Sequence, residues 1–102
     1  MEKRLAHYDL RAIIAIVKQR KATVFTKTAI DGGRQMDLTV GEMNDVICGL
    51  NPKCLYKSMT THSDNTVWQD VYHADTPGGR AYIKLTLRTN GALVIQFKEL
   101  GS

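Results

Sequence analysis

Near the C-terminal end of the sequence, four polar side chains carry the groups that acid–base chemistry on a phosphate needs. Tyr82 and Lys84 lie two residues apart on one candidate strand, and Gln96 and Lys98 do so on the next. A phenol or an amine can act as an acid or a base, and neighbouring lysines lower each other's pKa. On pattern alone, an ordinary solvent-facing strand with polar cross-strand pairs is the simpler interpretation.

The turn between the two strands decides whether these residues share a surface. A two-residue turn at Asn90-Gly91 would bury Lys98 and expose Phe97. A three-residue turn, Thr89 to Gly91 with a left-handed glycine, places the apolar residues of both strands on one face. Because register follows the hydrophobic face, we predict the three-residue turn.

This register brings the four polar residues together. Tyr82 lies opposite Lys98, and Lys84 lies opposite Gln96. Paired residues share a face of a sheet, so all four lie on the face away from the main core. The apolar pairs on the core face are Leu87 with Leu93, Leu85 with Ile95, and Ile83 with Phe97.

The first half of the sequence predicts helices. Asp9 precedes an apolar stripe that runs from Leu10 to Val17, which is typical of a helix of about three turns. The segment from Thr26 to Met36 is ambiguous, because Gly32-Gly33 would break anything longer than a short helix. A capping box formed by Thr39 and Glu42 predicts a second helix from Val40 to Leu50.

From Cys54 onward the pattern changes to strands. Residues with high β propensity alternate with period two, and four strands are predicted between recurring turn signals. The turn signals are His62 to Asn65, Asp75 to Gly79, and Asn90-Gly91. Helices followed by a meander of strands predict an α+β domain whose helices cover one face of an antiparallel sheet.

Length and charge limit the possible functions. The 102 residues form one domain, with residues 99–102 as a frayed tail. The longest apolar run, Ala12 to Val17, is too short to cross a bilayer, and no signal-type stretch opens the sequence, so we expect a cytoplasmic protein without membrane contact. The net charge of +4 suits a polyanionic partner. Five basic residues without an acid between Leu10 and Ile30 are either a phosphate-binding patch or a solvated helix end.

The cysteines and histidines give no metal or cofactor motif. Cys48 and Cys54, with His7, His62 and His73, lack metal-ligand spacing, and no phosphate-cradling glycine loop is present. We therefore expect neither a metal nor a cofactor. From the residues alone, a basic domain that binds RNA or joins a transcriptional regulator without catalysis stays an alternative to an enzyme, and so does a structural interaction domain.

A long segment gives the sequence a specific resemblance. The block from Tyr56 to Tyr72, YKSMTTHSDNTVWQDVY, closely resembles the motility quorum-sensing regulator (MqsR) family of bacterial toxins. Met1 to Arg4, Val46 to Leu50 and Phe97 to Glu99 also fit, so the resemblance spans nearly the whole chain. It implies a RelE-like compact α+β fold and a type II toxin–antitoxin system.

The resemblance also implies an activity and partners. The implied activity is that of an endoribonuclease, which cleaves mRNA at GC-containing triplets without a metal or the ribosome. The implied protein partner is a cognate antitoxin of the MqsA type, through which the toxin reaches operator DNA. The family's active-site residues fall on Lys57, Gln69, Tyr82 and Lys98. Substrate-binding positions fall on Tyr56, Met59, His73 and Lys84. His73 replaces an arginine found in the family, and a histidine there could supply pH-dependent charge.

The implied site sets a geometric requirement on the loop after His62. A four-residue loop, His62 to Asn65, would place Lys57 opposite Asp70, on the face away from Gln69. The site needs a loop one residue shorter or longer, or a bulge. We predict the shorter loop, His62 to Asp64, which makes Lys57 face Gln69 directly.

Overall fold

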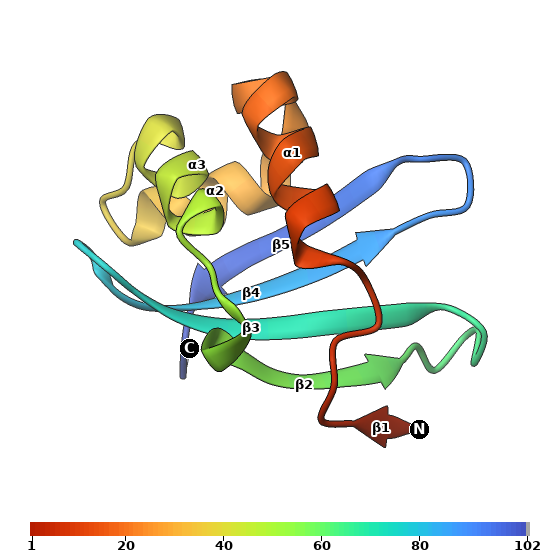
Figure 1. The fold of residues 1–102 in the computed structure, drawn as a ribbon. Helices are drawn as coiled ribbons and strands as arrows, with labels where there is room; N and C mark the ends of the chain where they lie inside the picture. Colours follow the sequence, from red (N-terminus) through yellow and green to blue (C-terminus); the bar gives the residue numbers. More distant parts are fainter. Residues whose placement is uncertain (102) are drawn as a thin grey trace.

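Helices cover one face of an antiparallel sheet in the computed structural model, which describes residues 1–101 (Figure 1). The helices are α1 (Leu10–Arg20), α2 (Lys27–Gln35) and α3 (Val40–Cys48), with short 3-10 helices at Lys21–Val24 and Pro52–Cys54. The strands are β1 (Glu2–Lys3), β2 (Leu55–Thr60), β3 (Trp68–Thr76), β4 (Gly79–Leu87) and β5 (Leu93–Glu99), in that order across the sheet. The predicted α+β fold is confirmed. Within residues 1–101, no helix has the length and apolar character needed to span a bilayer.

The helix ends follow local capping. The Asp9 side chain accepts a hydrogen bond from the backbone N–H of Arg11, which caps α1 as predicted. Both hydrogen bonds of the Thr39 and Glu42 capping box are present at the start of α3. This helix ends at Cys48, two residues before the predicted end at Leu50.

The segment that the sequence left ambiguous forms a short helix, α2, which continues through Gly32 and Gly33. Their lack of a side chain is needed for packing. A Cβ on Gly32 would lie 2.0 Å from the carbonyl oxygen of Phe97 in β5, and one on Gly33 would lie 2.3 Å from the sulfur of Met43 in α3. The glycines therefore lower local helix propensity but allow α2 to approach β5 and α3 closely.

The core lies between the helices and the sheet. Its larger side chains that are at most 1% exposed are Ile13 and Val17 of α1, Met43 and Ile47 of α3, and Tyr72, Ile83, Leu85, Ile95 and Phe97 of the sheet. In the described part of the chain, no helix lies over the opposite face of the sheet, which we call the open face (Figure 1).

The C-terminal hairpin has the predicted register. Tyr82 pairs with Lys98 and Lys84 with Gln96, and Gly91 is left-handed with φ +87°. The strand continues beyond the expected start of the frayed tail, because Glu99 belongs to β5 and the N–H of Leu100 donates to the carbonyl of Arg80 at 2.9 Å. Ser102 lies outside the described residues.

Candidate active site

Ladder partners define which side chains occupy the open face. β4 pairs with β3 on one side and with β5 on the other, and the partners of core residues such as Ile83 face the helices. The alternate residues of these strands, and of β2, face away, and those in the middle of this face are Lys57, Met59, Gln69, Val71, His73, Tyr82, Lys84, Gln96 and Lys98. Val71 is fully buried at the centre of this set, so the long side chains around it form a continuous layer.

The loop between β2 and β3 is longer than predicted. Met59 pairs with Gln69 and Lys57 with Val71, so the direct pairing of Lys57 with Gln69 is wrong by two residues. The loop contains five residues, 62–66, since the N–H of Thr61 donates to the carbonyl of Val67. Lys57 and Gln69 nevertheless share the open face, as the implied site requires.

Side-chain hydrogen bonds inside the loop explain its length. The Thr61 hydroxyl donates to the Asp64 carbonyl at 2.7 Å, and the Asp64 carboxylate accepts from the N–H and the hydroxyl of Thr66. The hydrogen bonds from Thr66 lower the pKa of Asp64. A polar loop of this kind adds residues that an apolar alternation pattern does not reveal.

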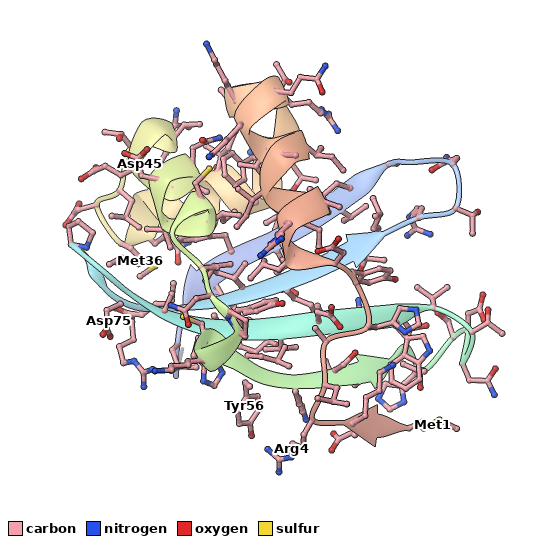
Figure 2. The ribbon with its side chains drawn as sticks, in the orientation of Figure 1. Met1, Arg4, Met36, Asp45, Tyr56 and Asp75 are labelled. Carbon is pink, nitrogen blue, oxygen red and sulfur yellow. The ribbon has the colours of Figure 1, made fainter. Side chains whose placement is uncertain are left out.

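A bulge in β2 adds Tyr56 to the open face. The register shifts between Leu55 and Lys57, which lets two consecutive residues project to the same side of the sheet. The Tyr56 ring stacks on His73 with 4.4 Å between ring centroids, and the Lys57 Nζ lies 5.6 Å from the Tyr56 ring centroid. Tyr56 is 46% exposed and projects from the sheet on the side away from the helices (Figure 2).

Three lysines, Lys57, Lys84 and Lys98, interact electrostatically with one another or with Tyr82. The Lys98 Nζ lies 5.2 Å from the Tyr82 ring centroid. Partial burial, with the adjacent Lys98, lowers the pKa of Lys84. Burial raises the pKa of Tyr82, although Lys57 opposes that change, so the phenol is protonated at neutral pH and can donate a hydrogen bond.

His73 lies between two aromatic rings. Its ring stacks on Tyr56 and is 6.0 Å from that of Tyr82, centroid to centroid. Burial, with the positive charge of Arg80, lowers the pKa of His73 below its ordinary value. His73 is therefore neutral at pH 7 and contributes a flat ring surface rather than the pH-dependent charge considered from the sequence.

Sequence reasoning missed the carboxylate beside this cluster. Glu2 of β1 accepts a hydrogen bond from the Lys57 Nζ at 2.7 Å. Glu2 lies opposite Met59, at the outer edge of the sheet. A two-residue strand has no alternation pattern to detect, so only its place in the matching segment Met1 to Arg4 could have drawn attention to Glu2.

The N-terminal segment is anchored by a buried carboxylate. Asp70 of β3 is fully buried and accepts hydrogen bonds from the N–H groups of His7 and Tyr8 at 3.0 and 2.8 Å. It also accepts one from the hydroxyl of Ser58 at 2.6 Å, and Ser58 is fully buried too. Asp70 therefore ties the segment between β1 and α1 to the helix side of the sheet.

The structure thus gathers all eight sequence-predicted site residues on the open face. Lys57, Gln69, Tyr82 and Lys98 come from four different strands, and Tyr56, Met59, His73 and Lys84 lie among them. In residues 1–101, no three His, Cys, Asp or Glu side chains come together as potential metal ligands. The arrangement offers cations, a neutral phenol and an amide around a shallow surface, which suits an extended polyanion.

Comparison with known proteins assigns the chain to a family. Residues 5–99 match the family described as "Motility quorum-sensing regulator, toxin of MqsA". A relative from Escherichia coli (strain K12), the mRNA interferase toxin MqsR, is 37% identical over 99 residues, which cover 97% of this chain and 99% of that protein. Because the match extends over nearly the full length of both chains and includes the open face, this chain belongs to the motility quorum-sensing regulator toxin family.

Proposed function

We propose that this chain is an mRNA endoribonuclease whose active site is the open face of the sheet. The convergence of Lys57, Gln69, Tyr82 and Lys98 on one surface supports the proposal most directly. The name of the 37% identical relative, an mRNA interferase toxin, agrees with it. The cleavage is independent of metal ions and of the ribosome.

In this reaction the RNA supplies its own nucleophile. The 2′-OH attacks the neighbouring phosphorus, the bond from phosphorus to the 5′ oxygen breaks, and the products carry a 2′,3′-cyclic phosphate and a 5′-OH. The reaction needs a base for the 2′-OH proton, an acid for the leaving oxygen and positive charge for the phosphorane-like transition state.

The open face provides groups for these roles. Lys57 and Lys98 stabilise the negative charge, and the neutral phenol of Tyr82 donates a hydrogen bond or a proton to the phosphate. Gln69 orients the ribose or the phosphate. Lys84 lies beside them, opposite Gln96, and binds the substrate phosphate.

The neighbouring residues bind the substrate. The stacked rings of Tyr56 and His73 form a platform on which a nucleobase can stack. Met59 lies between Glu2 and Gln69 in the ladder and contributes an apolar, polarisable contact.

We further propose that cleavage favours GC-containing triplets and that a cognate MqsA-like antitoxin inhibits it. The toxin reaches operator DNA through that antitoxin. The protein acts in the cytoplasm.

A matched pair of lysine variants tests the proposal. Lys98→Ala removes an ammonium group from the open face and should reduce the rate of RNA cleavage by about 10²-fold or more while the protein stays folded. Lys18→Ala removes the same charge from an exposed position on α1, on the helix side, and should keep the wild-type rate. Equal cleavage rates for folded Lys98→Ala and the wild type would remove Lys98 from the mechanism. RNA binding without any cleavage by the wild type would favour a non-catalytic RNA-binding module instead.

A further inference from the structure

An ion pair lies at the edge of the lysine cluster on the open face. The two residues of β1 point to opposite sides of the sheet: Glu2 lies opposite Met59 on the open face, whereas Lys3 lies opposite Ser58. The Lys3 Nζ accordingly lies 4.2 Å from the ring centroid of Trp68. β1 therefore presents one carboxylate, that of Glu2, to the open face, and that carboxylate binds Lys57.

Contacts on both sides of Glu2 hold its backbone in place. On one side, the N–H of Thr60 donates to the carbonyl of Met1 at 3.0 Å, which continues the pairing with β2. On the other side, buried Asp70 binds the backbone N–H groups of His7 and Tyr8. In Figure 2, Arg4 lies at the sheet edge near Tyr56, and the Arg4 guanidinium donates to the Tyr56 carbonyl at 3.4 Å. A short strand is thus fixed at a defined position beside the active site.

The ion pair stabilises the positive charge on Lys57. The hydrogen bond that Lys57 donates to Glu2 raises the pKa of Lys57, and the nearby Tyr56 and Tyr82 add to that effect. The same bond lowers the pKa of Glu2, helped by Arg4 and the terminal amino group. Lys57 is therefore an ammonium ion and Glu2 a carboxylate at neutral pH. Lys57 in this state provides positive charge and cannot accept the proton of a 2′-OH.

A second acid on the same face serves as a comparison. Asp75 lies near the far end of β3, where its carboxylate oxygen is 3.2 Å from the Arg80 Nε. It belongs to the same sheet face but pairs with an arginine instead of a lysine of the cluster. The two carboxylates thus carry equal charge and differ in the cation that they bind.

We propose that Glu2 is a positioning residue for RNA cleavage, which holds the Lys57 ammonium group where it meets the scissile phosphate. The proposal rests on the nuclease function proposed above. A lysine side chain has four rotatable bonds, and a short bond to a fixed carboxylate limits them to few conformations. The negative charge of Glu2 also repels the RNA backbone, so its benefit should appear in the rate of the chemical step and not in affinity.

The Glu2→Gln variant separates these two effects. It keeps an oxygen acceptor at nearly the same place but loses the charge. We expect the single-turnover cleavage rate at pH 7 to fall about tenfold, because Lys57 is less firmly positioned. Binding of an RNA with a 2′-deoxy group at the cleavage position should stay equal or become tighter by about two- to threefold, because an anion has been removed. Loss of fold would instead weaken both binding and cleavage.

The pH profile gives a readout that a purely structural role would not change. Lys57 must be protonated to act, and its pKa falls when the carboxylate is replaced, so the alkaline limb of the rate profile should move to lower pH. The groups that face the pair are Tyr56, Tyr82, Arg4 and the terminal amino group, and the substitution leaves all of them in place. A ¹³C NMR titration of the Lys57 side chain should show the same shift without RNA.

Asp75→Asn is the matched control. It removes the same charge from the same face, so RNA binding should tighten to a similar extent while the cleavage rate and the pH profile stay at wild-type values. If Glu2→Gln also keeps the wild-type rate and alkaline limb, the positioning role is wrong and the nuclease function stands. If the wild type cleaves no RNA, the proposed function fails and the role of Glu2 fails with it, whereas the NMR titration still tests the ion pair alone.

Discussion

Replacing Asp70 with Asn should destabilise the protein strongly, although the two side chains have nearly the same shape. One carboxylate oxygen of Asp70 accepts from the His7 N–H and the Ser58 hydroxyl, and the other accepts from the Tyr8 N–H. An Asn side chain has one acceptor oxygen and one NH₂ donor. In either orientation of the amide, one backbone N–H faces another donor and loses its partner, while the Ser58 hydroxyl can rotate to accept.

The size of the effect follows from burial. Asp70 is fully buried, and a hydrogen bond to a charged group contributes about 1.5–3 kcal/mol. Loss of one such bond, with an N–H left unpaired, should lower the free energy of unfolding by about 2–4 kcal/mol. For a domain of this size that corresponds to a decrease in Tm of about 10–25 °C.

Urea unfolding and hydrogen exchange together test this reasoning. Asp70→Asn should reduce the free energy of unfolding as stated, and the amide protons of His7 and Tyr8 should lose protection first. Asp9→Asn makes the same chemical change at the N-cap of α1, where Asn caps as well as Asp, and should be nearly neutral. An Asp70→Asn protein within about 0.5 kcal/mol of the wild type would refute the account of the buried carboxylate.

Two glycine substitutions and the titration of one tyrosine have effects whose signs are fixed by the structure. Gly32→Ala should lower the free energy of unfolding in urea by about 2 kcal/mol or more, because its Cβ would lie 2.0 Å from the Phe97 carbonyl oxygen. Gly41→Ala, on the exposed side of α3, should instead raise it by about 0.5–1 kcal/mol. An unchanged free energy of unfolding for Gly32→Ala would contradict the close packing of α2. Burial, with nearby Asp70, raises the pKa of Tyr72 to about 12. In the unfolded chain the pKa of Tyr72 is about 10, so the stability that its protonated phenol contributes is complete below pH 10. This contribution is lost as the pH rises through 12, by about 1 kcal/mol at pH 11 and about 2 kcal/mol at pH 12. The stability difference between wild type and Tyr72→Phe should shrink by that amount between pH 9 and 12, and a constant difference would show that Tyr72 does not titrate in this way.

The part of the site on β4 and β5 could be predicted because its hydrophobic pattern is strong. On both strands, apolar residues alternate with Tyr82, Lys84, Gln96 and Lys98, so an error of one residue would bury a lysine. The turn length followed from that requirement, and the structure has the predicted pairs. Local sequence was sufficient here because one face of each strand is buried in the core.

The part of the site on β1 and β2 depends on contacts that local patterns do not encode. The five-residue loop after Thr61 is stabilised by the Asp64 carboxylate, and β1 is held by Asp70, more than 60 residues away in the chain. The segment with the glycines of α2 stayed ambiguous for a similar reason, since helix propensity does not include the space that packing against Phe97 requires. In each case, tertiary contacts override or extend the local signal.

The chemistry of the RNA ends tests the central claim most directly. Purified protein should be incubated with a defined transcript in the presence of EDTA, and both ends of each fragment should be identified. The account predicts cleavage that persists with the chelator and leaves a 2′,3′-cyclic phosphate on one side and a 5′-OH on the other. Intact RNA, or 5′-phosphate ends that appear only with added divalent metal, would contradict it.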